Sequence, residues 1–220
     1  HTHQHMKTLR SELNPTEVRE MLTLVADRII AAEAELSQAD RDLGDGDHGL
    51  GMQRGMEAAK VALADLPEDA NASDAFSTVG KAMMSSMGGA SGVIFGTVFK
   101  ASGKALKNYM GGLDTRGFAM ALTAASQSVM ERGGAKPGDK TMLDALVPAS
   151  RKATEVGDQP IGEAIQEIAT AAEEGRDESR KFIATMGRAK TLGERSIGFP
   201  DAGACSVAII FRTMADYIAD

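Results

Sequence analysis

Hydrophobic positions recur at helical spacing along nearly the whole chain, and almost no stretch alternates in the way that a strand requires. The first helical pattern opens with Asn14, Pro15 and Glu17. Asn is a good N-cap, Pro suits the first helical position, and a Glu three residues after the cap completes a capping box. The apolar positions that follow are Val18, Met21, Leu22, Val25, Ile29, Ala32 and Leu36. This stripe predicts an amphipathic helix packed on one side.

Further segments extend the pattern to the end of the chain. They cover residues 50–65, 73–87, 91–108, 114–132, 139–156, 161–185 and 203–219. Pro148 falls inside the sixth helix and should kink it or mark an irregularity. No Pro/Ser-rich linker divides the chain, and the longest polar connections are short. We therefore expect an all-α protein with a single domain of eight helices in an up-and-down bundle.

Glycine is abundant for a helical protein. Of the 24 glycines, eleven cluster in residues 44–49, 88–92, 133–139 and 198–203. Because a glycine inside a helix costs about 1 kcal/mol relative to alanine, these clusters are expected to be loops between helices. In an up-and-down bundle, four such loops can share one end.

Charge and composition exclude several classes of function. The 220 residues carry a net charge of −7, with 4% aromatic residues and no Trp, which argues against a nucleic-acid partner. No apolar run approaches the ~18 to 20 residues of a spanning helix, and the N-terminus lacks the features of a signal peptide, so we expect a cytoplasmic protein with no membrane role. A single cysteine, Cys205, excludes an internal disulfide. Residues 1–5 hold three of the four histidines and look like a cloning remnant ahead of Met6, which leaves His48.

Carboxylates gather in the first glycine cluster. Asp40, Asp45 and Asp47 lie there beside His48, and hard oxygen ligands without cysteine suit Mg²⁺ or Ca²⁺. An EF-hand is excluded by spacing, because a loop counted from Asp40 places Gly51 where the bidentate Glu belongs. Asp and Gly also terminate helices and form turns. Three carboxylates and a histidine among glycines nevertheless favour a metal site.

The second cluster, residues 88–92, leads into an apolar helix. Glycines permit close approach of a ligand, and the free N–H groups at a helix N-terminus attract phosphate, with the Ser91 hydroxyl as a further donor. The alternative is that small residues serve close helix packing. A Walker sequence is absent, since no Gly-Lys-Ser/Thr follows.

The remaining two glycine clusters contain candidates for a flat apolar binding slot and for phosphate-binding arginines. Asp139 is expected to cap the sixth helix, and Gly133 and Met142 are candidates for the walls of a flat apolar slot such as adenine occupies. Arg188 and Arg195 lie between glycines, where a guanidinium can bind phosphate, although surface ion pairs are the alternative.

Four motifs in order resemble one family. Asp-Arg-Asp-Leu-Gly-Asp-Gly-Asp-His-Gly at 40–49, Gly-Gly-Ala-Ser-Gly at 88–92, Lys-Pro-Gly-Asp-Lys-Thr-Met at 136–142 and Leu-Gly-Glu-Arg-Ser-Ile-Gly at 192–198 are similar to the nucleotide-binding L subunit of dihydroxyacetone kinases. The resemblance covers residues 14–220. It implies an eight-helix antiparallel α-barrel with the nucleotide on the loops at one end.

The resemblance also implies site residues. Asp40, Asp45 and Asp47 would hold two Mg²⁺ ions that bridge the phosphates of ADP or ATP. Arg188 and His48 are the catalytic candidates. The residues implied to contact the nucleotide are His48, Gly49, Leu50, Gly51, Ala90, Ser91, Gly133, Met142, Arg188, Asp201, Ala202 and Gly203.

A partner is implied as well. In this family the acceptor, dihydroxyacetone or a related short ketose such as erythrulose, is bound covalently to a histidine of a separate K subunit, and nothing here resembles that half. The resemblance therefore implies an incomplete kinase. Its donor is either exchanging ATP, or bound ADP that a phosphocarrier of the sugar phosphotransferase system (the M subunit) rephosphorylates. Two other hypotheses are a nucleotide-sensing module acting on a transcription regulator and a purely structural bundle.

Overall fold

The structure contains the complete capping box that the sequence predicts at Asn14. In the computed structural model, which describes residues 10–44 and 46–219 apart from the side chain of Arg188, the Asn14 side chain accepts the N–H of Glu17 at 2.8 Å and the Glu17 carboxylate accepts the N–H of Asn14 at 2.9 Å. Asn71 and Asp74 form a second capping box. Residues 1–5, interpreted above as a cloning remnant, lie outside the described residues.

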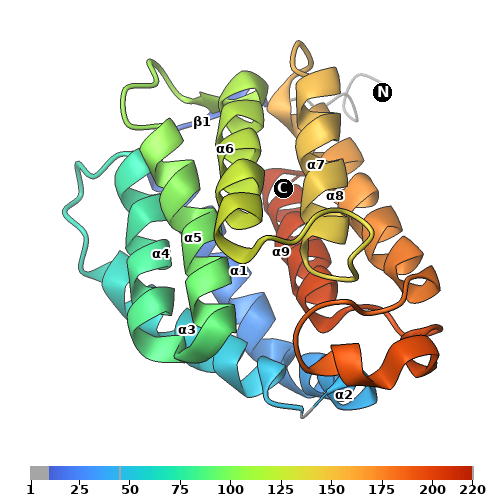
Figure 1. Cartoon of the computed structure of the whole chain (residues 1–220). Helices are drawn as coiled ribbons and strands as arrows, with labels where there is room; N and C mark the ends of the chain where they lie inside the picture. Colours follow the sequence, from blue (N-terminus) through green and yellow to red (C-terminus); the bar gives the residue numbers. More distant parts are fainter. Residues whose placement is uncertain (1–9, 45, 220) are drawn as a thin grey trace, which may run out of the picture.

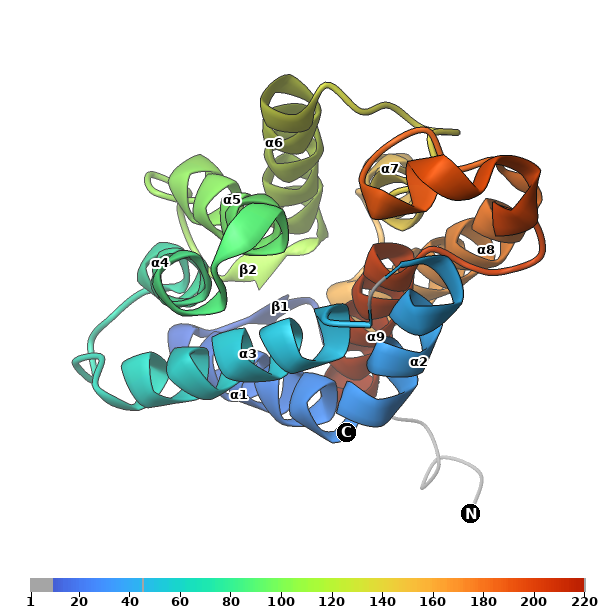
Figure 2. The same ribbon diagram turned by 60° about the horizontal axis from the view of Figure 1, so that its bottom comes forward.

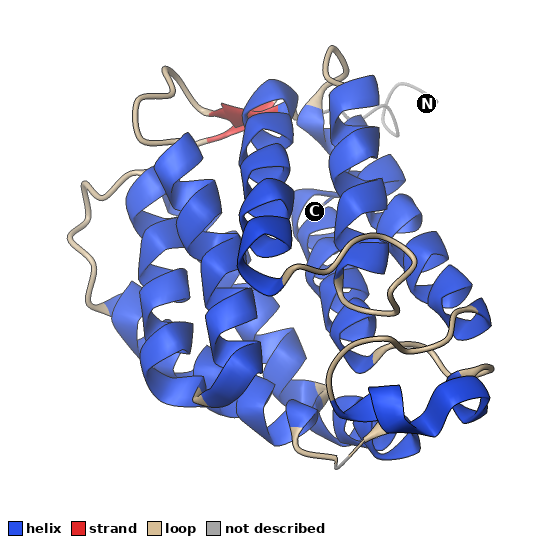
Figure 3. Ribbon diagram, viewed as in Figure 1, coloured by secondary structure: helices blue, strands red, loops and turns tan. Residues whose placement is uncertain are grey.

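Helices account for most of the described chain (Figure 3). The α-helices are α1 (Pro15–Ala31), α2 (Glu33–Leu43), α3 (His48–Ala64), α4 (Ala72–Met87), α5 (Gly89–Ala105), α6 (Thr115–Gly133), α7 (Leu143–Glu155), α8 (Ile161–Glu178) and α9 (Ala202–Ala219). Two 3-10 elements, η2 (Ser179–Lys181) and η3 (Arg188–Ser196), precede α9. The short strands β1 (Glu12–Leu13) and β2 (Leu113–Asp114) pair antiparallel.

Eight of these helices close into a ring. Taken in the order α1, α3, α4, α5, α6, α7, α8, α9, each helix packs on the next, and α9 returns to α1 (Figures 1 and 2). Neighbouring helices run in opposite directions, so the expected all-α barrel is confirmed. Its apolar residues point inward to one core, which includes the facing rings of Phe76 and Phe99.

The first expected helix is divided in two at Ala32. Ala32 has φ −90° and ψ 9°, and α2 turns away from α1 to pack on α3 and α9. The apolar stripe did not reveal this break, because Leu36 remains buried on the far side of it.

Two other helix boundaries differ from the prediction. The sixth helix begins at Leu143 instead of residue 139, because Lys140 has a φ of +64°, which is incompatible with a right-handed helix. It then continues through Pro148 without interruption. The seventh ends at Glu178, so residues 182–201 form a separate segment rather than the end of a helix.

All four glycine-rich connections meet at one end of the ring, the lower end in Figure 1. The paired strands lie at the opposite end, where they hold the entry of α1 beside the entry of α6 (Figure 3). Not every glycine is in a loop, however. A Cβ built on Gly80 would lie 2.7 Å from the carbonyl oxygen of Gly96, so these two glycines allow α4 and α5 to approach closely.

The last helix is the most apolar. By length and composition α9 resembles a membrane span, with a mean hydropathy of 1.3 over 18 residues. However, 61% of that window is buried inside the molecule, as is usual for the central helix of a folded core.

Candidate functional site

A cleft of about 500 Å³ opens at the glycine-rich end of the ring. Figure 2 looks onto this end, with α2, α3, α5 and η3 around it. Ten of the predicted site residues line the cleft: Asp40, Asp47, His48, Gly51, Ala90, Ser91, Met142, Asp201, Ala202 and Gly203. Residues more than 150 positions apart in the sequence therefore share one cavity.

Three predicted residues do not line it. Gly49 faces α2, because a Cβ there would lie 2.4 Å from the carbonyl oxygen of Glu33. The side chain of Leu50 is half exposed to solvent. Gly133 ends α6, with the side chain of Ile94 as its nearest neighbour. Two further predictions, Asp45 and the side chain of Arg188, fall outside the part of the chain that the structure describes.

Asp40, near the end of α2, holds the acidic loop that joins α2 to α3. Its Oδ2 accepts the backbone N–H of His48 at 3.0 Å, and its carbonyl oxygen accepts the N–H of Gly44 at 2.5 Å. Asp47 occupies the N-cap position of α3. Among the described residues, no group of three or more His, Cys, Asp or Glu side chains is arranged to hold a metal ion. The expected set is thus represented by Asp40 and Asp47, both of which line the cleft.

His48 points from the first turn of α3 toward α9. Its Nε2 lies 2.7 Å from Oγ of Ser206, and its ring is 5.8 Å from that of Phe95. Burial lowers the pKa of the imidazole, and the nearby Asp40 carboxylate only partly opposes the shift. At neutral pH His48 is therefore a neutral side chain at the edge of the cleft, able to share one proton with Ser206.

Two helix N-termini border the cleft, and at neither does the N-cap residue make a side-chain cap. These are the starts of α3, at His48, and of α5, at Gly89. Gly88 and Gly89 have φ values of +72° and +65°, which let α4 run directly into α5 and place Ala90 and Ser91 in its first turn. The first N–H of α3 already donates to Asp40, but the first turn of α5 has no side-chain cap, and its N–H groups and positive dipole end make this part of the cleft suitable for an anion.

Arg54 braces that turn, a role which the sequence did not reveal. From α3 its Nε and Nη2 each donate to a carbonyl oxygen at the end of α4, those of Ser86 and Met87, both at 3.1 Å. Arg54 also lines the cleft, so its charge faces the same space as the two helix N-termini.

The third connection is held by carboxylates, although not as expected. The prediction that Asp139 caps the sixth helix is wrong, because its carboxylate accepts the backbone N–H of Lys136 at 3.0 Å and pairs with that side chain at 2.9 Å. Asp144, in the first turn of α7, accepts the N–H groups of Gly138 and Thr141 in the preceding loop at 2.6 and 3.1 Å, and the N-cap residue Met142 makes no side-chain cap. Sequence reasoning selected the first acidic residue of the motif, whereas the helix begins beyond Lys140.

Asp201 caps α9. Its Oδ2 accepts the N–H of Ala204 at 2.9 Å, and burial raises the pKa of its carboxyl to about 7. The turn that follows packs on Met142, since a Cβ on Gly203 would lie 3.0 Å from the Met142 Cβ. Met142 and the Asp201–Gly203 turn thus form one wall of the cleft.

The lining of the cleft combines two kinds of chemistry. Carboxylates, the Arg54 cation and the N-terminus of α5 are polar or charged, whereas Met142, Met186 and Ile94 contribute apolar surface. A ligand with phosphates, a bound divalent cation and a flat apolar ring matches this arrangement.

Comparisons with known proteins agree with the arrangement. The DAK2 domain matches residues 42–216. The chain is 36% identical over 208 residues to the ADP-binding subunit DhaL of the PEP-dependent dihydroxyacetone kinase of Escherichia coli, covering 92% of this chain and 97% of that subunit. It is 40% identical over 200 residues to D-erythrulose kinase of Mycolicibacterium smegmatis, covering 88% of this chain but 34% of that enzyme.

A solved structure shares the fold. The dihydroxyacetone kinase of C. freundii in complex with AMP-PNP and Mg²⁺ superimposes with a TM-score of 0.72 at 26% identity, over 96% of this chain and 36% of that one. The chain thus spans about a third of the erythrulose kinases and of this dihydroxyacetone kinase, and nearly all of the E. coli subunit.

Proposed function

Because this chain belongs to the DAK2 domain family, we propose that it is the nucleotide-binding phosphotransferase subunit of a kinase for dihydroxyacetone or a related short ketose. One observation carries the proposal. Two carboxylates from the first glycine-rich connection and the N-terminus of α5, which has no side-chain cap and follows the second connection, face the same cleft. Carboxylates suit Mg²⁺ and helix N-termini suit phosphate, and a Mg-nucleotide presents both.

Asp40 and Asp47 fit a magnesium site. Both line the cleft, and no cysteine and no second histidine is found among its lining residues. These two residues, with Asp45 as the third carboxylate, would hold the proposed two Mg²⁺ ions. Bound Mg²⁺ would neutralise phosphate charge that otherwise resists transfer.

The protein's own groups would position the nucleotide. N–H groups of the first turn of α5, with the Ser91 hydroxyl, would bind phosphate oxygens. Met142 and the Asp201–Gly203 turn would contact the base and ribose. Arg188 follows Gly187, which lines the cleft, and is proposed to stabilise the transferring phosphoryl group. His48, held neutral, would donate or accept one hydrogen bond there without adding charge.

The acceptor is proposed to reside on another chain. Relatives similar in length to this one are named ADP-binding subunits of dihydroxyacetone kinases, while the erythrulose kinases are about three times as long. A K subunit carrying the ketose would therefore complete the enzyme. The phosphoryl donor is either exchanging ATP or a phosphocarrier protein that rephosphorylates bound ADP, and we propose a cytoplasmic location for either.

Reconstitution tests this proposal. The purified chain is dialysed against EDTA, returned to Mg²⁺, and mixed with a K subunit and dihydroxyacetone, with either ATP or ADP plus the phosphocarrier system as donor. We expect dihydroxyacetone phosphate to form with one donor. Asp40→Asn should abolish its formation, whereas Asp42→Asn, whose carboxylate only accepts from Gln38 on the exposed face of α2, should not.

The outcome also separates the alternatives. No product with either donor contradicts the kinase proposal. If nucleotide still binds in that case, the result favours the nucleotide-sensing module.

A further inference from the structure

Lys140 is an unusual lysine in the wall of the cleft. Its exposed fraction is 3%, and among the described residues it is the one non-glycine residue with a positive φ, at +64°. Burying an ammonium and adopting a left-handed backbone both cost free energy. A side chain kept in this state must make compensating contacts.

Its ammonium joins two segments that are distant in the sequence. Nζ donates to the carbonyl oxygen of Ser179 at 2.5 Å, directly after α8, and to the carbonyl oxygen of Phe199, just before the turn into α9. The 182–201 segment leaves the ring of helices shortly after Ser179 and returns to it shortly after Phe199. Lys140, on the loop that also carries Met142, therefore binds the chain near both ends of this segment.

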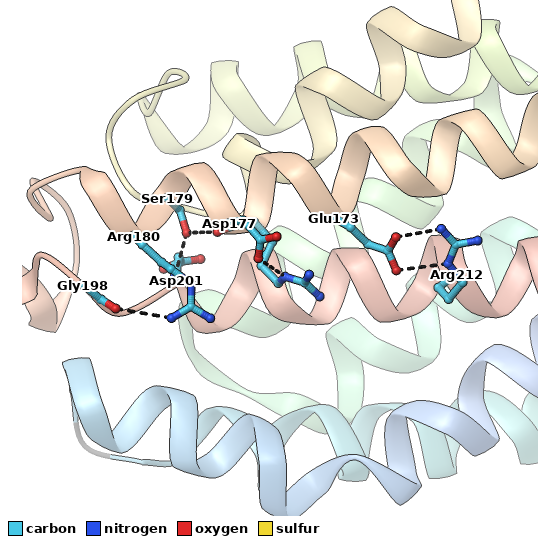
Figure 4. A network of polar contacts seen from close by, with 8 residues as sticks. Glu173, Asp177, Ser179, Arg180, Gly198, Asp201 and Arg212 are labelled. Carbon is cyan, nitrogen blue, oxygen red and sulfur yellow. Dashed lines mark hydrogen bonds and ion pairs between the residues drawn. The ribbon is translucent and has the colours of Figure 1, made fainter.

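Neighbouring hydrogen bonds support the same junction. The backbone N–H and the hydroxyl of Thr185 both donate to the carbonyl oxygen of Asp139, at 3.4 and 3.3 Å. Oγ of Ser179 accepts the N–H of Asp201 at 3.0 Å, and Arg180 reaches the carbonyl oxygen of Gly198 at 3.3 Å (Figure 4).

Two carboxylates lie close enough to balance the buried charge. Those of Asp144 and Asp201 raise the pKa of the Lys140 ammonium, against the stronger lowering by burial. The carboxylates are themselves fixed, since Asp144 accepts backbone N–H groups of the third connection and Asp201 caps α9. The cation thus sits between the two structures that form the Met142 wall of the cleft.

We propose that Lys140 is a positioning residue, which fixes the 182–201 segment and the Asp201–Gly203 turn against Met142 and thereby sets the affinity for nucleotide. The inference rests on the proposed function for the identity of the ligand. The structural part of the inference, that the Lys140 ammonium holds the 182–201 segment in place, does not depend on the proposed function.

Lys140→Met tests both parts, because it keeps an unbranched side chain of similar length and removes the ammonium. The matched control is Lys136→Met, four residues earlier on the same loop, where the lysine side chain is 76% exposed and pairs only with Asp139. The segment contains the tryptic sites Arg188, Lys190 and Arg195, of which the last two are used as the readout. Limited trypsin digestion without nucleotide, followed by mass spectrometry, measures its opening, and calorimetric titration with ADP and Mg²⁺ measures binding.

For Lys140→Met we expect at least about tenfold faster cleavage after Lys190 and Arg195, and at least about tenfold weaker binding of ADP. Cleavage elsewhere in the ring should stay at the wild-type rate, a selectivity that general destabilisation would not give. Lys136→Met should match wild type in both measurements. Cleavage at the wild-type rate, cleavage raised equally over the whole chain, or unchanged ADP affinity would overturn the proposal.

Two further outcomes are informative. If the wild-type protein itself does not bind ADP, the proposed function fails, while the cleavage comparison still decides whether Lys140 holds the segment. If Lys140→Met does not fold, hydrogen exchange of the wild-type protein replaces it. Slow exchange of the Gly198 and Asp201 amides supports the proposal, and exchange at the rate of unstructured amides contradicts it.

Discussion

Arg54 and Arg19 make the same pair of contacts in two different places. Each donates to two consecutive carbonyl oxygens near the end of a helix, Arg54 to those of Ser86 and Met87 in the last turn of α4 and Arg19 to those of Leu66 and Pro67 just after α3. Only Arg54 lines the cleft. Comparing variants of the two arginines therefore distinguishes a contribution to the stability of the fold from a contribution to ligand binding in the cleft.

Substituting each arginine by methionine should reveal that difference. Both variants lose two hydrogen bonds, and we expect each to lower the free energy of unfolding by about 1 to 2 kcal/mol. Arg54→Met should also weaken binding of ADP with Mg²⁺ by about tenfold, because the start of α5 loses its brace and the cleft loses a positive charge. Arg19→Met should bind as wild type does in the same titration. Equal affinities for the two variants would exclude Arg54 from the site.

Asp201 should make stability depend on pH. Its carboxyl has a pKa of about 7 in the folded protein, against about 3.9 in an unfolded chain. Between these values the folded state retains a proton that the unfolded state has released, so the Asp201 contribution is present at low pH and is lost as the pH rises through 7.

Asp201→Asn isolates this effect, since the amide is neutral throughout and keeps an acceptor for the N–H of Ala204. Relative to wild type, the variant should gain in melting temperature between pH 5 and pH 8. Scanning calorimetry at the two pH values measures the change. A constant difference between variant and wild type would mean that Asp201 is ionised across the whole range.

Sequence motifs pointed to those cleft-lining residues whose expected chemistry is local. Asp40, Asp47 and Ser91, which line the cleft, were predicted because carboxylates and a hydroxyl beside glycines suggest ligands wherever they occur. Arg54 and Ser206 were missed, because their importance depends on which carbonyl or imidazole the fold brings beside them. The sequence holds no signal for that proximity.

Two glycines inside helices, Gly80 and Gly51, differ in how closely other atoms surround them. Gly80, inside α4, faces α5, where an added Cβ would lie 2.7 Å from the backbone oxygen of Gly96 and 2.7 Å from the backbone nitrogen of Lys100. Gly51, inside α3, has open space, with the Met87 methyl carbon as the nearest atom at 3.9 Å. The same substitution should therefore have opposite effects at the two positions.

Gly80→Ala should destabilise the protein by about 1 to 3 kcal/mol, because two helix backbones must move apart. Gly51→Ala should stabilise it by up to about 1 kcal/mol, because it reduces the freedom of the unfolded chain without a clash. Urea denaturation of both variants checks the signs. A stabilising Gly80→Ala would show that α4 and α5 are not in close backbone contact.

Helix boundaries were predicted correctly where nearby residues determine them. The capping box at Asn14 located the start of α1, and Gly134, the C-cap of α6 with a φ of +68°, lies in a predicted glycine loop. The break at Ala32 and the late start of α7 at Leu143 were not predictable. Tertiary packing of α2 determines the first, and the buried contacts of Lys140 determine the second.

At the scale of the molecule, the ring explains why the site is assembled from distant residues. An antiparallel ring of eight helices sends every second connection to the same end. The four glycine clusters are those connections, so their convergence followed from helix count alone. The order of packing, and the position of α2 across that end, depend on the three-dimensional core and were not available from the pattern.

The net charge of −7 has a specific meaning in this arrangement. Part of it lies in Asp40 and Asp47, which line the cleft and whose negative charge a bound divalent cation would neutralise. We therefore predict that metal and nucleotide bind together and that each is weak alone.

Thermal unfolding with ADP tests that central claim most directly. With ADP and Mg²⁺ at about 100 times the dissociation constant, the unfolding free energy should rise by about 2.7 kcal/mol, and EDTA should remove the gain. Asp40→Asn should lose the gain, while the exposed Asp42→Asn keeps it. An unchanged melting temperature with ADP and Mg²⁺, or a gain that persists in EDTA, would contradict a Mg-nucleotide site in this cleft.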